Sequence, residues 1–288
     1  MRLERGSRVG EPSEGVIDRR QVLGTMLTVG AVAATGGTSL AGRLISQRAE
    51  VREDLESLFR EAGLEGCFTL YDVDQKRLVF VNQKRAERRL VPASTYKIPH
   101  SLIALETGVV KSPDEILPYG GKPAWIKAWE RDMSLREAIR ISNVPVYQGV
   151  ARRIGHERMQ RWVDRLGYGS RKLGSAIDQF WLVGPLEISA VEQVRFLARL
   201  AQAKLPASQR NQQLVREILR VEKTSGYELF AKTGWAADLK PQIGWWVGWV
   251  EKEGRPYCFA LNADLKDQGD ADKRVPLARE LLRRLKVL

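Results

Sequence analysis

The most informative stretch of the chain is "PASTYKIPHSLIALETG", residues 92–108. It places a serine and a lysine three residues apart at the expected start of a helix. The apolar positions that follow recur at helical spacing: Ile98, Leu102, Ile103 and Leu105. Residues three apart share one face of a helix, so the hydroxyl of Ser94 and the amine of Lys97 are expected to lie side by side. An ammonium group that faces a core needs an explanation, because burying an unpaired charge costs free energy.

A serine beside an unprotonated lysine is a candidate nucleophile with its own base. The positive end of the helix dipole favours negative charge on the Ser94 oxygen. An ordinary lysine has a pKa of about 10.4 and is protonated at neutral pH, but an apolar environment lowers the pKa of an amine. The S-x-x-K spacing alone also fits a capping serine followed by a surface lysine. The functional interpretation therefore needs support from elsewhere in the chain.

Two other stretches provide that support. "SNV" at 142–144 supplies a second hydroxyl, on Ser142, before the apolar Val144. "KTG" at 232–234 ends a β-type run and combines a cation, a hydroxyl and a glycine, which suits an anionic substrate lying along a strand edge. A serine–lysine pair, a second serine and a lysine–threonine–glycine run, in this order, form the constellation of the penicillin-recognising serine acyltransferases.

Composition and charge place the chain among ordinary globular proteins. Its 288 residues are 43% hydrophobic and 28% charged, so we expect a sizeable core in one large domain or two intertwined subdomains. The formal net charge is +12, but Lys and Arg are scattered along the chain and no nucleic-acid motif accompanies them. A solvated basic surface and no nucleic-acid partner are expected, and the sequence makes no prediction of the oligomeric state.

Histidine and cysteine content narrow the chemistry further. The two histidines, His100 and His156, accompany neither a G-x-S-x-G run nor a two-histidine zinc helix. The base is therefore not expected to be histidine, and no metal site is expected. The two cysteines, Cys67 and Cys258, each lie in an apolar strand-like run. Two buried free thiols and a disulfide formed after export both fit this placement.

The N-terminus is typical of an export signal. Arg19 and Arg20 stand directly before a charge-free run rich in Gly, Ala and Thr, and residues 1–41 are predicted to be a signal of the twin-arginine type. This signal type carries folded proteins across bacterial inner membranes, so the predicted location is the periplasm, with no stable membrane span once the signal is removed. An anchoring helix is the alternative, because the run is about long enough to span a bilayer.

Apolar periodicity predicts that strands from both chain ends build one sheet. Helix-like periods occupy 47–62 and 275–288, and strand-like runs occupy 66–73, 77–82, 227–232, 243–250 and 256–264. Residues 94–220 are mostly helical, with capping boxes predicted from "SPDE" at 112–115 and "SAVE" at 189–192. The predicted fold class is α/β (α+β): an antiparallel sheet flanked by helices, with an inserted, mainly helical subdomain, all within one catalytic domain at 47–288.

Longer stretches closely resemble the class D (oxacillinase) β-lactamases, from about residue 50 to the C-terminus. They are "PASTYKIPHSLIALETGVV", "GKPAWIKAWERDMSLREAIRISNVPVYQGVARRIG", "FWLVGPLEISAVEQVRFL" and "AKTGW". The resemblance implies a β-lactamase/transpeptidase-like fold, and hydrolysis of the β-lactam amide of penicillin-type antibiotics through an acyl-enzyme. It also implies that CO2 adds to Lys97 as a carbamate, with no metal and no other cofactor. The residues that would form the apolar carbamate pocket are Val144, Trp181 and Leu182.

The same resemblance implies the role of each site residue. Catalysis falls to Ser94 as nucleophile, carbamylated Lys97 as base, and Ser142 and Lys232 as the proton relay to the departing nitrogen. Substrate binding falls to Thr233, Gly234, Trp235 and Arg274. The oxyanion is expected between the backbone N–H groups of Ser94 and Trp235, and the carboxylate of the β-lactam beside Thr233 and Arg274.

Two positions depart from the family pattern. Tyr96 stands where the family usually has phenylalanine, and Ser170 of "YGS" stands where it usually has asparagine. Tyr96 is a mild change, whereas Ser170 removes an amide that helps to brace the site.

Two other functions are compatible with the same motifs. A penicillin-binding transpeptidase or carboxypeptidase would be acylated by penicillin but release it slowly. A non-catalytic β-lactam sensor domain would also carry "STYK", yet such a receptor needs several membrane helices upstream. Only a short predicted signal precedes residue 47, which favours the enzyme.

Overall fold

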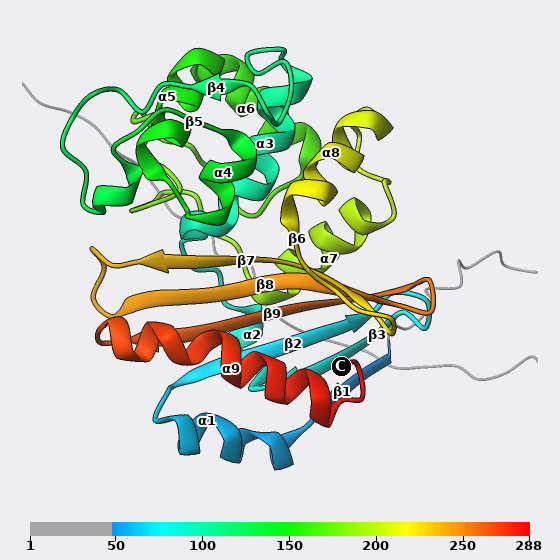
Figure 1. Ribbon diagram of the computed structural model, residues 1–288. Helices are drawn as coiled ribbons and strands as arrows, with labels where there is room; N and C mark the ends of the chain where they lie inside the picture. Colours follow the sequence, from blue (N-terminus) through cyan, green and yellow to red (C-terminus); the bar gives the residue numbers. More distant parts are fainter. Residues whose placement is uncertain (1–47) are drawn as a thin grey trace, which may run out of the picture. The chain divides into compact units, whose positions relative to one another are not determined.

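The computed structural model describes residues 48–288, so the export signal expected over residues 1–41 lies outside the described residues. A seven-stranded sheet in the order β1-β3-β2-β9-β8-β7-β6 forms the centre of the fold (Figure 1). The strands are β1 (Arg48–Val51), β2 (Gly66–Asp72), β3 (Arg77–Val81), β6 (Arg220–Lys223), β7 (Glu228–Ala236), β8 (Gln242–Lys252) and β9 (Arg255–Leu265). Every neighbouring pair is antiparallel except β1 and β3, which are parallel. The expected sheet from both chain ends is confirmed, with one parallel strand added at its edge.

Helices cover both faces of this sheet (Figure 1). One face carries α1 (Glu56–Ala62) and α9 (Gln268–Arg284). The other face carries α2 (Gln83–Glu87), α3 (Lys97–Glu106), α4 (Leu135–Arg140), α5 (Val144–Ile154), α6 (His156–Leu166), α7 (Ala190–Ala201) and α8 (Gln209–Leu219). A small sheet of β4 (Ile116–Leu117) and β5 (Met133–Ser134) belongs to the helical part. The inserted, mainly helical subdomain is therefore confirmed.

Strand alternation divides the core into two clusters, one on each face of the sheet. Cys67 of β2 packs into the larger cluster with residues of α3, α5 and α7, while the next residue, Phe68, packs with residues of α1 and α9. Successive side chains of a strand point to opposite faces, so a strand covered on both sides is apolar throughout. This double covering explains why the strands read as continuous apolar runs rather than as alternating ones.

The two cysteines are buried free thiols. In the pairing of β2 with β9, Cys67 lies opposite Asn262, and Cys258 lies opposite Tyr71. The two thiols are thus four residues apart along the ladder, which is roughly 13 Å at the usual rise per residue. A disulfide needs Cα atoms within about 7 Å, so the alternative of a disulfide is excluded for this structure.

The capping box expected at 112–115 is wrong. These residues form a turn, and β4 begins immediately after Glu115. The carboxylate of Glu115 accepts from the backbone N–H of Lys111 at 2.6 Å, and Asp114 is bound by Arg136. The acidic side chains therefore stabilise a turn rather than the first turn of a helix. The second expected box is confirmed, because Ser189 and Glu192 cap α7 reciprocally.

The first helix expected, over residues 47–62, is shorter than predicted. Its first part is β1, which pairs with β3, and a 3-10 turn (Glu53–Leu55) leads from there into α1. Only the second part has its apolar positions in the core, with Leu55 and Phe59 buried. Backbone pairing at the sheet edge overrides the local helical pattern here.

The closing helix begins two turns earlier than the expected 275–288. Asp267 caps it by accepting from the backbone N–H of Asp270 at 3.0 Å. Pro276 lies inside the helix. Arg274, expected just before the helix, is therefore a helical residue whose side chain direction is set by α9.

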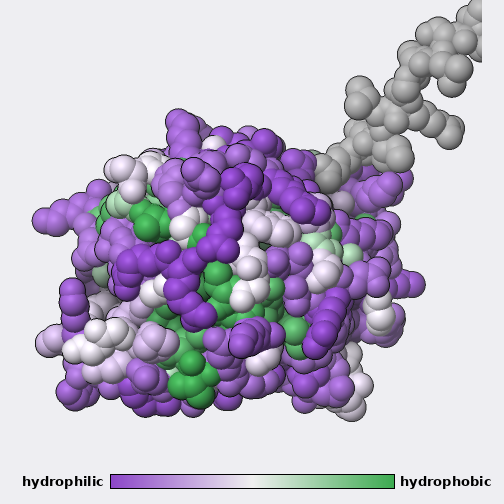
Figure 2. Space-filling view, turned by 90° about the horizontal axis from the view of Figure 1, so that it is seen from above, coloured by the Kyte–Doolittle hydropathy of each residue, from purple (hydrophilic) through white to green (hydrophobic). Residues whose placement is uncertain are grey.

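Seen from the side of the helical subdomain, the surface is mostly hydrophilic, with apolar side chains gathered towards its middle (Figure 2). Between residues 48 and 288, none of the helices is both long and apolar enough to cross a membrane.

Candidate active site

The predicted nucleophile lies at the junction of a 3-10 turn and a helix. Ser94 belongs to the 3-10 helix η2 (Ala93–Tyr96), which runs directly into α3. Lys97 is the first residue of α3, and its Nζ donates to the Oγ of Ser94 at 2.8 Å. Lys97 is fully buried, whereas Ser94 keeps 7% of its surface exposed. Ser94 thus keeps some contact with solvent, while Lys97 behind it is sealed from water.

Burial sets the protonation of Lys97. Desolvation lowers the pKa of its amine well below the ordinary value, and the nearby charge of Lys232 lowers it further. The structure describes no carboxylate paired with this amine, so nothing offsets the cost of a positive charge there. The neutral amine, which has a free lone pair, is the favoured form.

A second serine–lysine pair faces the first. Lys232 lies on β7, and its Nζ donates to the Oγ of Ser142 at 2.5 Å. Lys232 is 5% exposed, and burial, with a further contribution from Arg274, lowers its pKa to about 7. Ser142 has a φ of 59°, in the left-handed region that non-glycine residues rarely adopt. Such a backbone persists only where neighbouring contacts hold it.

Trp129 supplies those contacts, and sequence reasoning missed it. Its indole Nε1 donates to the carbonyl of Ile141 at 2.9 Å, and its own carbonyl accepts from the side chain of Asn143 at 3.0 Å. Both neighbours of Ser142 are therefore hydrogen-bonded to one buried tryptophan. Nothing in the sequence distinguished Trp129 from the other seven tryptophans except its place in the stretch that resembles the family.

The lysine–threonine–glycine run passes very close to the nucleophile turn. A Cβ on Gly234 would lie 3.0 Å from the carbonyl oxygen of Pro92 and 3.0 Å from Cγ2 of Thr95. Glycine lets β7 approach this turn without the crowding that a Cβ would bring. Thr233 lies next to it on the strand, and the Nε1 of Trp235 donates to the side chain of Gln242 at 2.8 Å. The expected strand edge is thus brought against Ser94.

Arg274 reaches the same strand from α9 on the opposite face of the sheet. Its Nη1 donates to the carbonyl of Gly234, and its Nε donates to the carbonyl of Ala271 at 2.6 Å. A Cβ on Gly244 would lie 2.8 Å from Cδ of Arg274, so this glycine makes room for the side chain. Burial lowers the pKa of Arg274 to about 10.

The three residues expected to form an apolar pocket lie on two segments. Trp181 is fully buried and stacks on the ring of Tyr96 at 5.8 Å, next in sequence to Lys97. Its Nε1 has no hydrogen-bond partner within residues 48–288. Val144 starts α5, directly after the Ser142 turn, and Leu182 is half-buried beside Trp181. Their direct contact with an added carbon dioxide remains a prediction.

A cavity of about 240 Å³ adjoins the second serine–lysine pair. Its walls come from α4, the end of α8, β6, β7 and β8, and include Lys232 and Thr233. This cavity lies where the sheet meets the helical subdomain, a common place for ligand sites, and Ser94, Lys97 and Ser142 do not line it.

Comparison with known proteins agrees with this geometry. The family model for the penicillin binding protein transpeptidase domain matches residues 66–283. β-Lactamase OXA-10 of Pseudomonas aeruginosa is 40% identical over 253 residues, covering 87% of this chain and 92% of that enzyme. β-Lactamase OXA-48 of Klebsiella pneumoniae is 38% identical over 230 residues, covering 80% and 87%. The chain belongs to the class D β-lactamases.

Solved structures of class D β-lactamases share its fold. The enzyme FUS-1 (OXA-85) of Fusobacterium nucleatum subsp. polymorphum superposes with a TM-score of 0.80 at 41% identity, covering 82% of this chain and 99% of that one. The class D β-lactamase YbXI from Nostoc gives a TM-score of 0.79 at 42% identity, covering 81% and 99%. The α+β fold and the family predicted from sequence are therefore confirmed.

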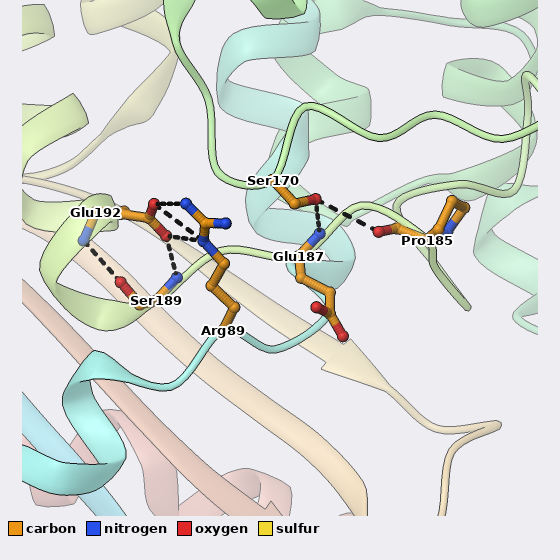
Figure 3. A network of polar contacts seen from close by, with 6 residues as sticks. All are labelled: Arg89, Ser170, Pro185, Glu187, Ser189 and Glu192. Atoms are coloured by element: carbon orange, nitrogen blue, oxygen red, sulfur yellow. Dashed lines mark hydrogen bonds and ion pairs between the residues drawn. The ribbon is translucent and has the colours of Figure 1, made fainter. Parts of the chain in front are cut away.

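This class D β-lactamase uses Ser170 as a brace despite the missing amide. The Oγ of Ser170 accepts from the backbone N–H of Glu187 at 3.0 Å, and lies 3.4 Å from the carbonyl of Pro185 (Figure 3). Its backbone N–H donates to the carbonyl of Glu187 at 2.7 Å. Ser189, two residues after Glu187, caps α7. The hydroxyl thus ties the "YGS" turn to the segment that joins Trp181 to α7.

The described part of this class D β-lactamase contains no candidate metal site. No group of three or more His, Cys, Asp and Glu side chains lies close enough there to hold a metal ion. The polar groups of the site are instead hydroxyls, amines and one guanidinium. Such groups act on protons and on anionic substrate atoms.

Proposed function

We propose that this chain hydrolyses the β-lactam amide of penicillin-type antibiotics through an acyl-enzyme on Ser94, with carbamylated Lys97 as general base. One observation carries the proposal: the fully buried Lys97 amine donates to the Ser94 hydroxyl at 2.8 Å, with no carboxylate of the described chain to hold its charge. β-Lactamase is the printed activity of the relatives at about 40% identity.

The residues around Lys97 fit a carbamate. A neutral amine attacks the carbon of CO2, an N–C bond forms, and one proton leaves to water, so that the amine becomes an anion. The unpaired Nε1–H of buried Trp181 is a donor that such an anion would satisfy. Val144 and Leu182 would supply the apolar walls. When present, this group supplies an anionic base that accepts the Ser94 proton and later a proton of water.

Ser94 and the second pair divide the acylation step. The Oγ of Ser94 bonds to the lactam carbonyl carbon, and the C–N bond of the ring breaks. Ser142, which accepts from Lys232, passes a proton to the departing nitrogen. The backbone N–H groups of Ser94 and Trp235 stabilise the oxyanion. This role is supported by the close approach of β7 to the Ser94 turn at Gly234.

The cationic side chains of Lys232 and Arg274 and the hydroxyl of Thr233 would hold the substrate carboxylate. Thr233 lies on the strand beside Lys232, and Arg274 binds the carbonyl of Gly234 from beneath. Their combined charge favours an anion at this strand end. Water then attacks the acyl carbonyl, and the bond to Ser94 breaks to release the opened drug.

Mass spectrometry and a chromogenic lactam assay test the proposal together. Incubation with a penicillin should add one drug mass to the peptide that contains Ser94, and the adduct should disappear as the drug is consumed. A stable adduct without turnover would indicate a transpeptidase or a sensor instead. No adduct, or an adduct on another peptide, would overturn the role of Ser94.

The proposed location is the periplasm, reached through the twin-arginine route. The support is the sequence of residues 1–41, with Arg19 and Arg20 before the apolar run. A reporter fused to these residues should reach the periplasm. Replacing both arginines by lysine should stop this export, and unchanged export would show that the route is wrong.

A further inference from the structure

A buried histidine lies one helical turn after the proposed base, and the proposed function does not use it. His100 is fully buried in α3. Neither Nδ1 nor Nε2 has a hydrogen-bond partner among residues 48–288. Its ring lies 5.2 Å from Tyr147, 5.3 Å from Trp181 and 5.5 Å from Tyr96, measured between ring centroids. An imidazole thus occupies a position where the surrounding rings would accommodate an apolar side chain.

His100 and Lys97 share the same surroundings. They are three residues apart on one face of α3, and the ring of Tyr147 lies 5.2 Å from the Nζ of Lys97 as well as beside His100. Trp181, the third member of this cluster, also has a buried nitrogen without a partner. Three unpaired nitrogen atoms therefore belong to one buried cluster of side chains that includes Lys97.

An unpaired buried donor is expensive. Leaving a polar group without its hydrogen bond costs roughly 1–3 kcal/mol, and such groups in native proteins usually mark a partner, often a water molecule or an ion. Burial, with a smaller contribution from the neighbouring Lys97 amine, lowers the pKa of His100 to about 3, so the ring is neutral. A neutral ring has one N–H donor and one acceptor nitrogen. The donor suits an anionic oxygen, and a hydrogen bond to a charged group is among the stronger ones.

We propose that His100 is a positioning residue for the carbamate of Lys97, to which it donates a ring N–H together with the indole N–H of Trp181. The inference rests on the proposed function, since it assigns a partner to a group formed there. A carbamate has two oxygen atoms, and two N–H donors from different segments hold it in one orientation beside Ser94. The cluster thereby raises the affinity of Lys97 for CO2, and each donor gains the partner that it lacks.

Nuclear magnetic resonance on the unaltered protein gives the most direct test. With 15N-labelled histidine and 13C-labelled bicarbonate, the carbamate carbon and both histidine rings are observed in one titration. The ring nitrogens of His100 should shift with the same half-saturating bicarbonate concentration as the carbamate signal. His156 is an internal control, because its Nε2 lies 2.6 Å from the carbonyl of Gly174, far along the chain from this cluster. Carbamate formation with no shift at His100 would overturn the inference.

Variants measure how strongly His100 acts. His100→Phe keeps an aromatic ring without nitrogen, and should require about tenfold more bicarbonate for half-maximal carbamate signal. Deacylation should slow in parallel and recover when bicarbonate is raised. His100→Gln and His100→Asn return an amide N–H near Nε2 or Nδ1, and one of them should restore most of the affinity. Unchanged bicarbonate dependence in all three variants would contradict the proposal.

A matched variant separates positioning from general disturbance of the cluster. Tyr96→Phe removes one buried polar atom from the same cluster, but that hydroxyl donates to Sδ of Met159 at 3.1 Å and not towards Lys97. Its carbamate titration should match that of the parent. Loss of affinity in Tyr96→Phe as large as in His100→Phe would show that packing alone is responsible. A parent with no carbamate signal, against a Lys97→Ala blank, would instead overturn the proposed base.

Discussion

Two buried lysines lie near Ser94, the proposed nucleophile, and their surroundings differ. Lys97 starts α3 among the rings of Tyr96, Tyr147 and Trp181, and its amine donates to the hydroxyl of Ser94. Lys232 lies on a strand edge beside Ser142, Thr233 and a cavity. Burial lowers the pKa of both amines, that of Lys97 well below its ordinary value and that of Lys232 to about 7.

The comparison shows how the neighbours of a residue decide its chemistry. An apolar cage favours a neutral amine, which is a nucleophile for CO2 and a base once carbamylated. A polar strand edge keeps an amine that gains and loses its proton near neutrality, which suits a relay and an anion partner. The predictions that follow break or sharpen this division of labour.

Replacing Lys97 by Ala should have the largest effect. Both proton transfers lose their base, so turnover should fall about a thousandfold, which corresponds to about 4 kcal/mol of barrier. Deacylation should suffer most, and the acyl adduct on Ser94 should accumulate. Mass spectrometry of the adduct with time measures both steps. Lys172→Ala, at an exposed position, is the control. Normal turnover in Lys97→Ala would show that Lys97 is not the base.

Replacing Lys232 by Ala should cost less and act on a different step. Loss of the donor to Ser142 and of one cation at the strand edge should lower kcat/KM about a hundredfold, mainly through acylation. Stopped-flow measurement of acylation and deacylation separates the two lysines. A variant that acylates normally but does not deacylate would reverse the roles assigned to the pair.

The plot of kcat/KM against pH should fall on both sides of neutrality, with Lys232 responsible for the alkaline limb and the Lys97 carbamate for the acid limb. Below its pKa of about 7 Lys232 is a cation, and above it the cation is lost, so kcat/KM should fall up to tenfold per pH unit above neutrality. In acid the carbamate is protonated and decomposes, so activity should fall there too. Added bicarbonate should restore the acid limb and leave the alkaline limb unchanged. Restoration of both limbs would mean that Lys232 is not the group responsible.

Trp129→Phe should give the smallest effect. The ring remains, but the N–H that binds the carbonyl of Ile141 is lost, and the strained backbone of Ser142 is held less firmly. A decrease in kcat/KM of about fivefold is expected, with little change in deacylation, since a neutral hydrogen bond contributes about 1 kcal/mol. Trp162→Phe, on α6, is the control. Equal effects of the two changes would contradict the proposal that Trp129 holds the backbone of Ser142.

Much of the fold was predictable because its signals are local. The apolar runs of β2, β8 and β9 and the capping box at Ser189 need only neighbouring residues to be recognised. The errors arise where distant partners decide. β1 is a strand because β3 offers it hydrogen bonds, and the residues at 112–115 form a turn because Lys111 and Arg136 bind the acidic side chains.

For the site, the sequence predicted which residues come together, but not which residues support them. Ser94, Lys97, Ser142 and the lysine–threonine–glycine run carry motifs whose spacing the chemistry itself requires. Trp129 acts through two backbone contacts that no spacing reveals, and the unpaired nitrogens of His100 become visible only when its neighbours are known. At Ser170 the sequence suggested a loss that the structure does not have. The residue lacks the amide of the family pattern, but its hydroxyl still accepts a hydrogen bond from the backbone of Glu187.

Removing carbon dioxide tests most directly whether Lys97 acts as a carbamate. The protein is acidified, degassed and returned to neutral pH without bicarbonate, and hydrolysis of a chromogenic lactam is followed before and after bicarbonate is added. We expect low initial activity that recovers fully with bicarbonate, and no such recovery in Lys97→Ala. Full activity in the absence of carbon dioxide would contradict the account and leave Lys97 as a plain amine base.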